Sequence, residues 1–247
     1  MILILIIGFS FLGSVGAISL ASAYLLFPEK IRHSIVPCLI SYATGTLLGA
    51  AFLGLLPHAM SHAQPTPVLA VVLAGIIGFF VLEKIVVWRH CHDGECEVHG
   101  RAGALILVGD AFHNFVDGVT IAAAFIASIP VGIATGLAIL AHELPQEVGD
   151  FAILLESGYT RRQAILYNIL SGLSTFPGAL LAYFLLTATQ RLTPYVMAIS
   201  AASFIYIAIA DLIPSLHHKS ELKQAISQFI FILAGIGTIA LFHMESK

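Results

Sequence analysis

Charged side chains are scarce in this sequence of 247 residues. Asp, Glu, Lys and Arg make up 10% of the chain, whereas apolar residues make up 58% and the mean hydropathy is +0.96. This low charge content excludes an ordinary water-soluble domain and is typical of a polytopic membrane protein, whose partner is the lipid bilayer. The net charge is −3 and no basic patch is long enough to bind nucleic acid, which is therefore excluded as a partner.

Cysteine is also scarce, with three in the chain. Cys38 stands at the start of an apolar stretch, where we expect a small buried side chain, so the cysteines do not indicate a disulfide framework. A cleaved signal peptide is not indicated either, because no positive residue precedes the first apolar stretch and no small-residue cleavage pattern follows it. We expect that stretch to be retained as the first helix.

Long apolar stretches, in contrast, are abundant. A bilayer core needs about 20 apolar residues per helix, and polar breaks divide the chain into eight such stretches. The predicted spans are about 2–26, 36–60, 68–88, 103–127, 131–156, 163–188, 195–216 and 225–243. Because the connections are short, the sequence predicts an all-α protein in which residues 1–247 form one transmembrane domain of eight helices.

Lys and Arg residues are distributed unequally between the two ends of these spans. Alternating the loops places only Arg191 and Lys247 on one side. The other side receives Lys30, Arg32, Lys84, Arg89, Arg101, Arg161, Arg162, Lys219 and Lys223. By the positive-inside rule the basic side is cytoplasmic, so both termini are predicted to be extracytoplasmic.

Two spans that run in opposite directions end in similar sequences, Leu56-Pro57-His58 and Ile213-Pro214-Ser215. This similarity predicts an inverted repeat of spans 1–3 and 6–8, with spans 4 and 5 between them. Proline lacks a backbone N–H, and at both of these positions we expect a simple kink.

Acidic residues occur deep inside three spans that contain no Lys or Arg. Each charged side chain at the centre of a membrane helix costs about 2.5–3.5 kcal/mol. The acids are Asp110, Asp117, Glu143, Glu147, Asp150 and Asp211. Unless they are protonated, a cation from outside the chain must neutralise them, and a divalent metal ion does so most simply.

The spacing of these polar residues places them on shared helix faces, since residues four apart lie on one side of a helix. In span 4, His113 and Asp117 point the same way, with Asp110 one turn earlier and Asn114 beside them. In span 5 the corresponding residues are His142 with Gln146, Glu143 with Glu147, and Asp150 one turn further on. The two spans are antiparallel neighbours, so the faces can meet at one depth. Imidazole and carboxylate together suit zinc, iron, manganese, cobalt or nickel, whereas an all-oxygen site suits calcium or magnesium.

These motifs resemble those of the ZIP (Zrt-, Irt-like) family of divalent metal transporters, and the chain looks like a bacterial-type member. The resemblance rests on His-Asn-Phe-x-Asp-Gly at His113–Gly118 and His-Glu-x-Pro-Gln-Glu-x-Gly-Asp at His142–Asp150. It implies uptake of metal into the cytoplasm, zinc first, with iron, manganese, cadmium or cobalt as other substrates. It also implies an elevator-like movement of helices, homodimers and a location in the bacterial inner membrane, with no prosthetic group.

The resemblance further implies a site for one or two metal ions between spans 4 and 5. One position would use His113, Asp117, His142 and Gln146, and the other Asn114 and Glu143, with Gln146 as a bridge. Some members complete the second position with an acid in span 6, but residues 160–188 contain none here. Weaker ligands in that span are Asn168, Ser171 and Thr175.

Further metal-binding residues are predicted outside the centre. His58 and His62 lie at the outer end of span 2, where they could collect metal, and Asp211 in span 7 could bind metal in transit, carry a proton or hydrogen-bond a broken helix. The cytoplasmic loop 89–102 holds a labile metal-binding tract. Its residues are His90, Cys91, His92, Cys96 and His99.

Other functions also require mid-span metal ligands. An intramembrane metalloprotease needs His-Glu-x-x-His, but Gln146 stands where the second His belongs. We therefore do not expect an enzyme. A passive metal channel shares the ligands but needs sites that release the ion quickly. A proton-coupled exchanger or exporter differs only in its coupling, so both transport alternatives stay open.

Overall fold

The structure is a computed structural model that describes residues 1–24, 26–88, 98–217 and 222–244, and every regular element in them is a helix. Six stretches are long and apolar enough to cross a membrane. They are Ile2–Tyr24, Ser34–His62, Pro65–Ile85, Arg161–Ala188, Gln190–Leu216 and Leu222–Phe242. Two further helices of 30 and 28 residues, α6 (Val98–Ala127) and α7 (Ile129–Glu156), carry the polar motifs.

Several of the six stretches consist of more than one helical element. The first contains α1 (Ile2–Phe11), η1 (Leu12–Gly16) and α2 (Ala17–Tyr24), and the second contains α3 (Glu29–Gly49), η2 (Ala50–Leu55) and α4 (Leu56–His62). The third is α5 (Pro65–Trp88), and the fourth contains α8 (Arg161–Gly172) and α9 (Thr175–Ala188). The fifth contains η3 (Gln190–Leu192), α10 (Thr193–Tyr206), η4 (Ile207–Leu212) and α11 (Ile213–Leu216), and the last is α12 (Leu222–Met244).

The predicted spans and the observed helices share many of their C-terminal ends, at residues 88, 127, 156, 188 and 216. The first helix begins at residue 2, as predicted, and the later ones begin earlier than predicted, in most cases because polar residues continue the helix beyond its apolar part. The predicted loop 89–102 was wrong at its end for this reason, since residues 98–102 belong to α6. Local signals fix other starts: Ser128 caps α7, and Thr160 forms a capping box with Gln163 at the start of α8.

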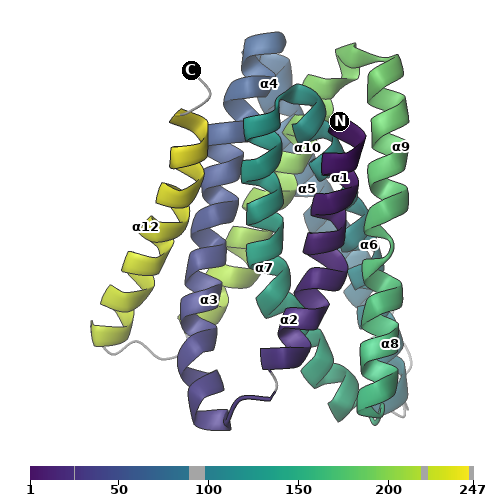
Figure 1. Ribbon diagram of the computed structural model, residues 1–247, viewed down its shortest axis with the longest axis vertical. Coiled ribbons are helices and arrows are strands. Elements are labelled where there is room, and N and C mark those ends of the chain that lie inside the picture. The colour runs from purple at the N-terminus through teal and green to yellow at the C-terminus, as the bar shows by residue number, and fades with distance from the viewer. Residues whose placement is uncertain (25, 89–97, 218–221, 245–247) are drawn as a thin grey trace.

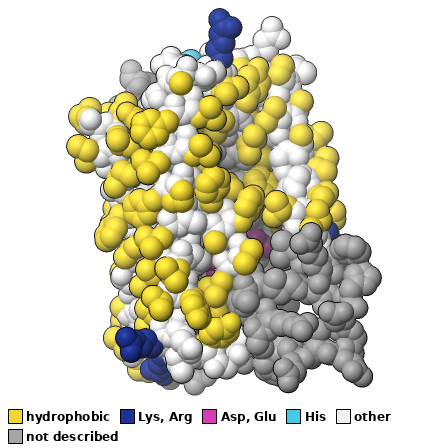
Figure 2. Space-filling view, turned by 90° about the vertical axis from the view of Figure 1, so that its right-hand side faces the viewer, with side chains coloured by type: hydrophobic (Ala, Val, Ile, Leu, Met, Phe, Trp, Pro, Cys, Tyr) yellow, Lys and Arg dark blue, Asp and Glu magenta, His cyan; other side chains and the backbone are white. Residues whose placement is uncertain are grey.

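The helices form an upright bundle in which the first helix begins and α12 ends at the same end of the molecule (Figure 1). Hydrophobic side chains cover much of the outer surface (Figure 2). Leu73 on α5, Phe184 on α9 and Phe229 on α12 are each more than 60% exposed. Such apolar outer faces are suited to lipid, and the chain is a polytopic membrane protein.

Glycines allow two helix pairs to pack backbone against backbone. On α6, a methyl group at Gly118 would overlap the carbonyl oxygen of Thr175 on α9, and one at Gly178 would overlap that of Phe115. The pair α3 and α12 is built in the same way, with Gly45 against Ile232 and Gly235 against Tyr42. We divide the helices into two groups around these pairs: α1, α2 and α6–α9 in one, and α3–α5 and α10–α12 in the other, which pack on each other most extensively through α3 and α7.

The kinks expected at Pro57 and Pro214 take the form of π-helical turns. The Leu56 N–H bonds the Ala51 carbonyl, five residues back, and the Ile213 N–H bonds that of Ala208 in the same way. In both cases the π turn ends two residues before the proline, which has no N–H for the regular ladder. The equivalent distortion in two spans that run in opposite directions accords with the predicted inverted repeat.

Candidate metal centre

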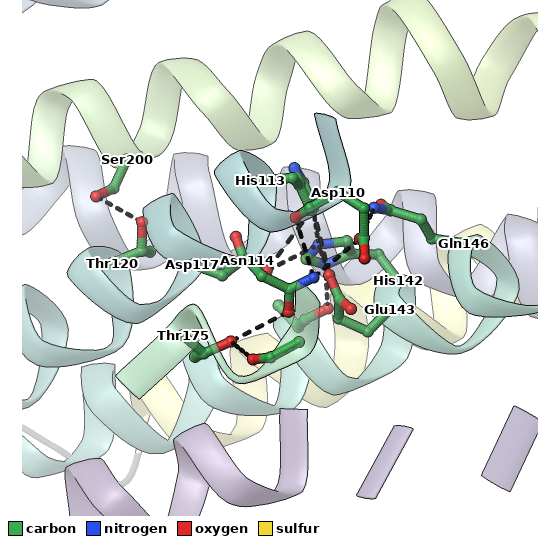
Figure 3. Close-up of polar contacts among 12 residues, drawn as sticks. Asp110, His113, Asn114, Asp117, Thr120, His142, Glu143, Gln146, Thr175 and Ser200 are labelled. Atoms are coloured by element: carbon green, nitrogen blue, oxygen red, sulfur yellow. Dashed lines mark hydrogen bonds and ion pairs between the residues drawn. The ribbon is translucent and has the colours of Figure 1, made fainter. Parts of the chain in front are cut away.

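Four predicted ligands meet where α6 and α7 face each other. His113 and Asp117 come from successive turns of α6, and His142 and Glu143 from α7 (Figure 3). The Nε2 atoms of the two histidines are 3.2 Å apart, His142 Nε2 is 3.2 Å from Asp117 Oδ2, and His113 Nε2 is 3.3 Å from Glu143 Oε1. Ligand atoms around a tetrahedral zinc ion lie about 3.3 Å apart, given bonds of about 2.0–2.1 Å. The four side chains are therefore spaced for one metal ion.

The two carboxylates of this cluster are buried and short of hydrogen-bond donors. Asp117 is 1% exposed and Glu143 0%, and none of their oxygens has a hydrogen-bond partner among the described residues. Their contacts within that part of the chain are with the two imidazoles. Buried carboxylates without donors are costly unless a cation neutralises them.

The ring of His142 is oriented by the backbone of its own helix. Its Nδ1 lies 3.0 Å from the carbonyl oxygen of Ala138, which can only accept a hydrogen bond. Nδ1 therefore carries the proton, and the lone pair of Nε2 faces the cluster. This is the arrangement by which metal-binding histidines are usually held. The sequence did not predict it, although the i, i−4 spacing was visible.

Asn114 and Gln146, also predicted as ligands, are both bound to Asp110. Their amide nitrogens donate to Asp110 Oδ1 at 2.9 Å and 3.3 Å (Figure 3). Ser171 donates to the other carboxylate oxygen of Asp110. The Thr175 hydroxyl lies 3.1 Å from Asn114 Oδ1. Ser171 and Thr175, suggested as weak ligands, thus contact the residues around the cluster, whereas the buried Asn168 Oδ1 has no partner in the described chain.

Comparison with known proteins places this arrangement in a family. A protein-family model described as "ZIP Zinc transporter" matches residues 88–243, which include both motifs. The chain belongs to the ZIP family. The match bears out the resemblance, and its description is of transporters and not of enzymes.

Individual relatives carry the same description. "Zinc transporter ZIP10" of Danio rerio is 40% identical over 139 residues, which is 56% of this chain and 16% of that protein. "Zinc transporter ZIP13" of Pongo abelii is 33% identical over 225 residues, or 83% of this chain and 66% of the relative. "Zinc transporter zipt-7.2" of Caenorhabditis elegans is 31% identical over 258 residues, covering 80% and 56%. The chain thus spans only part of each relative's length.

In this ZIP protein the remaining predicted acids lie around the four-residue cluster. Glu147 is 1% exposed, and neither of its oxygens has a hydrogen-bond partner in the described chain. Asp150 and Asp211 instead line a cavity of about 540 Å³ that also reaches Asp110, His113 and His142. Acidic atoms are visible at mid-height among the hydrophobic side chains (Figure 2).

This cavity opens toward one end of the bundle, where α5, α7 and α11 end. Its lower lining includes Leu82 and Glu83 of α5 and Ser215 of α11. Sequence reasoning did not identify the pair Glu83 and Tyr206, in which the Tyr206 hydroxyl donates to the Glu83 carboxylate across the cavity wall. We name it the inner cavity.

A second cavity of about 840 Å³ lies at the other end and includes His58, His62 and Arg191. The two histidine rings are stacked with centroids 4.3 Å apart. We name it the outer cavity. Along α6, the fully buried stretch from Thr120 to Phe125 separates it from Asp117. Thr120 Oγ1 donates to Ser200 of α10 at 2.9 Å within this barrier. The four-residue cluster therefore communicates with the inner cavity and is closed toward the outer one.

The predicted metal-binding tract lies almost entirely outside the described residues. This holds for His90, Cys91, His92 and Cys96, whereas His99 belongs to the first turn of α6.

Proposed function

We propose that this ZIP protein carries divalent metal ions, zinc first, across the membrane into the cytoplasm. The observation that supports this most is the buried cluster of His113, Asp117, His142 and Glu143, whose two carboxylates contact imidazoles but no hydrogen-bond donor in the described chain. Two nitrogen and two oxygen ligands at tetrahedral spacing favour zinc over calcium or magnesium. The relatives named above are described as zinc transporters.

A second metal position would adjoin the first, on the side of Asn114 and Gln146. The amide oxygens of these residues are weak ligands, and no acid of α8 or α9 can assist them. We therefore propose that one ion binds firmly at the four-residue cluster and that a second binds weakly beside it.

The ion is proposed to pass first through the outer cavity, then through the metal centre and finally through the inner cavity. In this structure the centre is open to the inner cavity and closed from the outer one, which accords with alternating access rather than with a channel open at both ends. Backbone-to-backbone glycine contacts occur within each helix group. Between the groups the contact at Gly54 of η2 is looser: a methyl group there would lie 4.0 Å from a side-chain carbon of Val131 of α7. An interface made by side chains suits an elevator-like movement of one group against the other.

The orientation of the protein in the membrane follows from the distribution of charge. We propose eight spans, with α6 and α7 crossing the membrane because their polar faces meet inside the bundle. Lys84 of α5 and Arg161 of α8 lie at the end to which the inner cavity opens, and by the positive-inside rule this end is cytoplasmic. Both termini would then be extracytoplasmic, and the outer cavity with His58 and His62 would receive the metal.

Uptake of zinc into proteoliposomes tests the proposal. Wild type should accumulate zinc, whereas His142→Ala and Glu143→Gln should lose most of the uptake, since each removes one ligand. His217→Ala, at the exposed end of α11, is the matched control for loss of an imidazole and should transport normally. Equal uptake by all four folded proteins would show that the cluster does not bind the transported ion.

A further inference from the structure

Asp110 accepts hydrogen bonds from three helices although it is not among the four clustered ligands. Oδ1 accepts from Asn114 of α6 and Gln146 of α7 (Figure 3). Oδ2 accepts from Ser171 of α8. Asp110 is only 4% exposed, so these bonds form largely out of contact with bulk water. A carboxylate offers about four lone-pair sites, and three are occupied by donors. Asp110 is therefore poorly placed to bind a metal ion itself.

The contacts of Asp110 determine which way two neighbouring amide groups face. A carboxylate accepts hydrogen bonds, so the NH₂ groups of Asn114 and Gln146 must point toward it. The second amide hydrogen of Asn114 is also occupied, since Nδ2 lies 3.2 Å from the backbone carbonyl oxygen of Asp110. An amide binds a metal ion through its oxygen. Asn114 Oδ1 already accepts a hydrogen bond from Thr175 at 3.1 Å, which leaves it one lone pair. Each amide can therefore offer a metal ion its oxygen and not its nitrogen.

We propose that Asp110 is a positioning residue of the metal centre, which holds the NH₂ groups of Asn114 and Gln146 and so directs their oxygens to the metal. This role rests on the proposed metal transport, and it explains why a carboxylate is buried beside the ligands. Without the Asp110 carboxylate the Gln146 amide can rotate and present a nitrogen that does not bind metal, whereas Asn114 keeps its bonds to the Asp110 backbone carbonyl and to Thr175 and loses only part of its support. Loss of groups that orient ligands commonly weakens metal binding about 10- to 100-fold.

Zinc binding to the purified full chain in detergent, measured by competition with a zinc-binding dye, tests this role. Asp110→Glu keeps the charge but displaces the carboxylate, and Asp110→Asn keeps the size but removes the charge. Asp150→Asn removes one charge from the same cavity and is the matched control for Asp110→Asn. Both Asp110 variants should bind the second, weaker zinc ion about 10- to 100-fold more weakly, and the loss in Asp110→Asn should exceed that in Asp150→Asn.

A double-mutant comparison separates positioning from direct binding. In the Asn114→Ala, Gln146→Ala background the amides are gone, so Asp110→Glu should cost less than about twofold. An undiminished loss in that background would mean that Asp110 binds the metal itself and would overturn the proposal. So would wild-type affinity in Asp110→Glu. If the longer side chain of Asp110→Glu prevents folding, the test is the comparison of Asp110→Asn with Asp150→Asn. Equal losses of zinc affinity in these two variants would overturn the proposal.

His142→Ala distinguishes this inference from the proposed function. If wild type and His142→Ala bind zinc alike, the metal centre itself is wrong. If His142→Ala loses zinc while Asp110→Glu keeps it, the centre holds and only the positioning role fails.

Discussion

At the scale of single residues, the proposed metal centre combines two buried carboxylates with two imidazoles and no fixed cation from the described chain. The buried carboxylates of Asp117 and Glu143 repel each other, which destabilises the folded protein. Zinc should therefore stabilise it strongly, because the bound ion neutralises both charges. A ligand at 100 times its Kd adds about 2.7 kcal/mol to the free energy of unfolding. We predict that zinc raises the melting temperature of wild type, and that Asp117→Asn melts no lower than wild type without metal but gains much less from zinc. Thermal unfolding with zinc, and with calcium as the control ion, measures both effects.

Protons should compete with the metal for the same atoms. His113 and His142 bind metal only as neutral imidazoles, and Asp117 and Glu143 only as carboxylates. We predict that the initial rate of zinc uptake falls as the pH is lowered from 7 toward 5. The rate is measured at fixed free zinc with equal pH on both sides of the vesicle membrane. A rate that rises steadily with acidification would instead indicate coupling to protons.

The residues of the centre could be predicted from their spacing, but their hydrogen bonds could not. The i, i+4 spacing places His113 and Asp117 on one face of α6, whereas His142 and Glu143 are adjacent in sequence and join the cluster because this part of α7 faces α6. The role of Asp110 depends on Ser171, which lies 61 residues away in the sequence and reaches it only through the packing of α8. Local spacing carries no information about that contact.

At the scale of helices, Gly118 sets the distance between α6 and α9. A methyl group there would overlap the backbone of Thr175, whereas a methyl on Gly78 of α5 would have no atom within 4 Å. We predict that Gly118→Ala lowers the melting temperature and reduces zinc uptake, because α6 carries His113 and Asp117. Gly78→Ala should be neutral or slightly stabilising, since alanine favours a helix by about 1 kcal/mol over glycine. If both variants melt and transport alike, the close approach of α6 and α9 is not required.

Helix ends were predictable because apolar length and breakers determine them, whereas the interruptions inside helices were not. The expected proline kinks became π turns at η2 and η4, but η1 contains no proline, and α8 and α9 are separated only at Leu173 and Ser174. These irregularities depend on how neighbouring helices satisfy the displaced backbone groups. A pattern read along one helix cannot show them.

At the scale of the whole molecule, the sequence predicted an even number of passes, and the structure agrees in that the first helix begins and α12 ends at one end of the bundle (Figure 1). The division into two helix groups was not predictable from residues alone. The closest helix pair in each group depends on which glycines face which backbones, as with Gly118 and Thr175 or Gly45 and Ile232. These contacts join helices that are distant in sequence.

The closed outer barrier yields a prediction about access. Val116 lines the inner cavity beside Asp117, Ser215 lies nearer its opening, and Gln190 lines the outer cavity. In a chain whose Cys38, Cys91 and Cys96 are replaced by serine, a membrane-impermeant thiol reagent is applied to either side of oriented vesicles. Val116→Cys and Ser215→Cys should react from the cytoplasmic side alone and Gln190→Cys from the opposite side. Zinc should slow the reaction of Val116→Cys, because a bound ion and its ligands block the path beside it, but it should not slow that of Ser215→Cys.

Reaction of Val116→Cys from the outer side alone, with Ser215→Cys still reacting from the inner side, would mean that the barrier lies between the metal centre and the cytoplasm. The conformation that predominates in the membrane would then be the outward-open one.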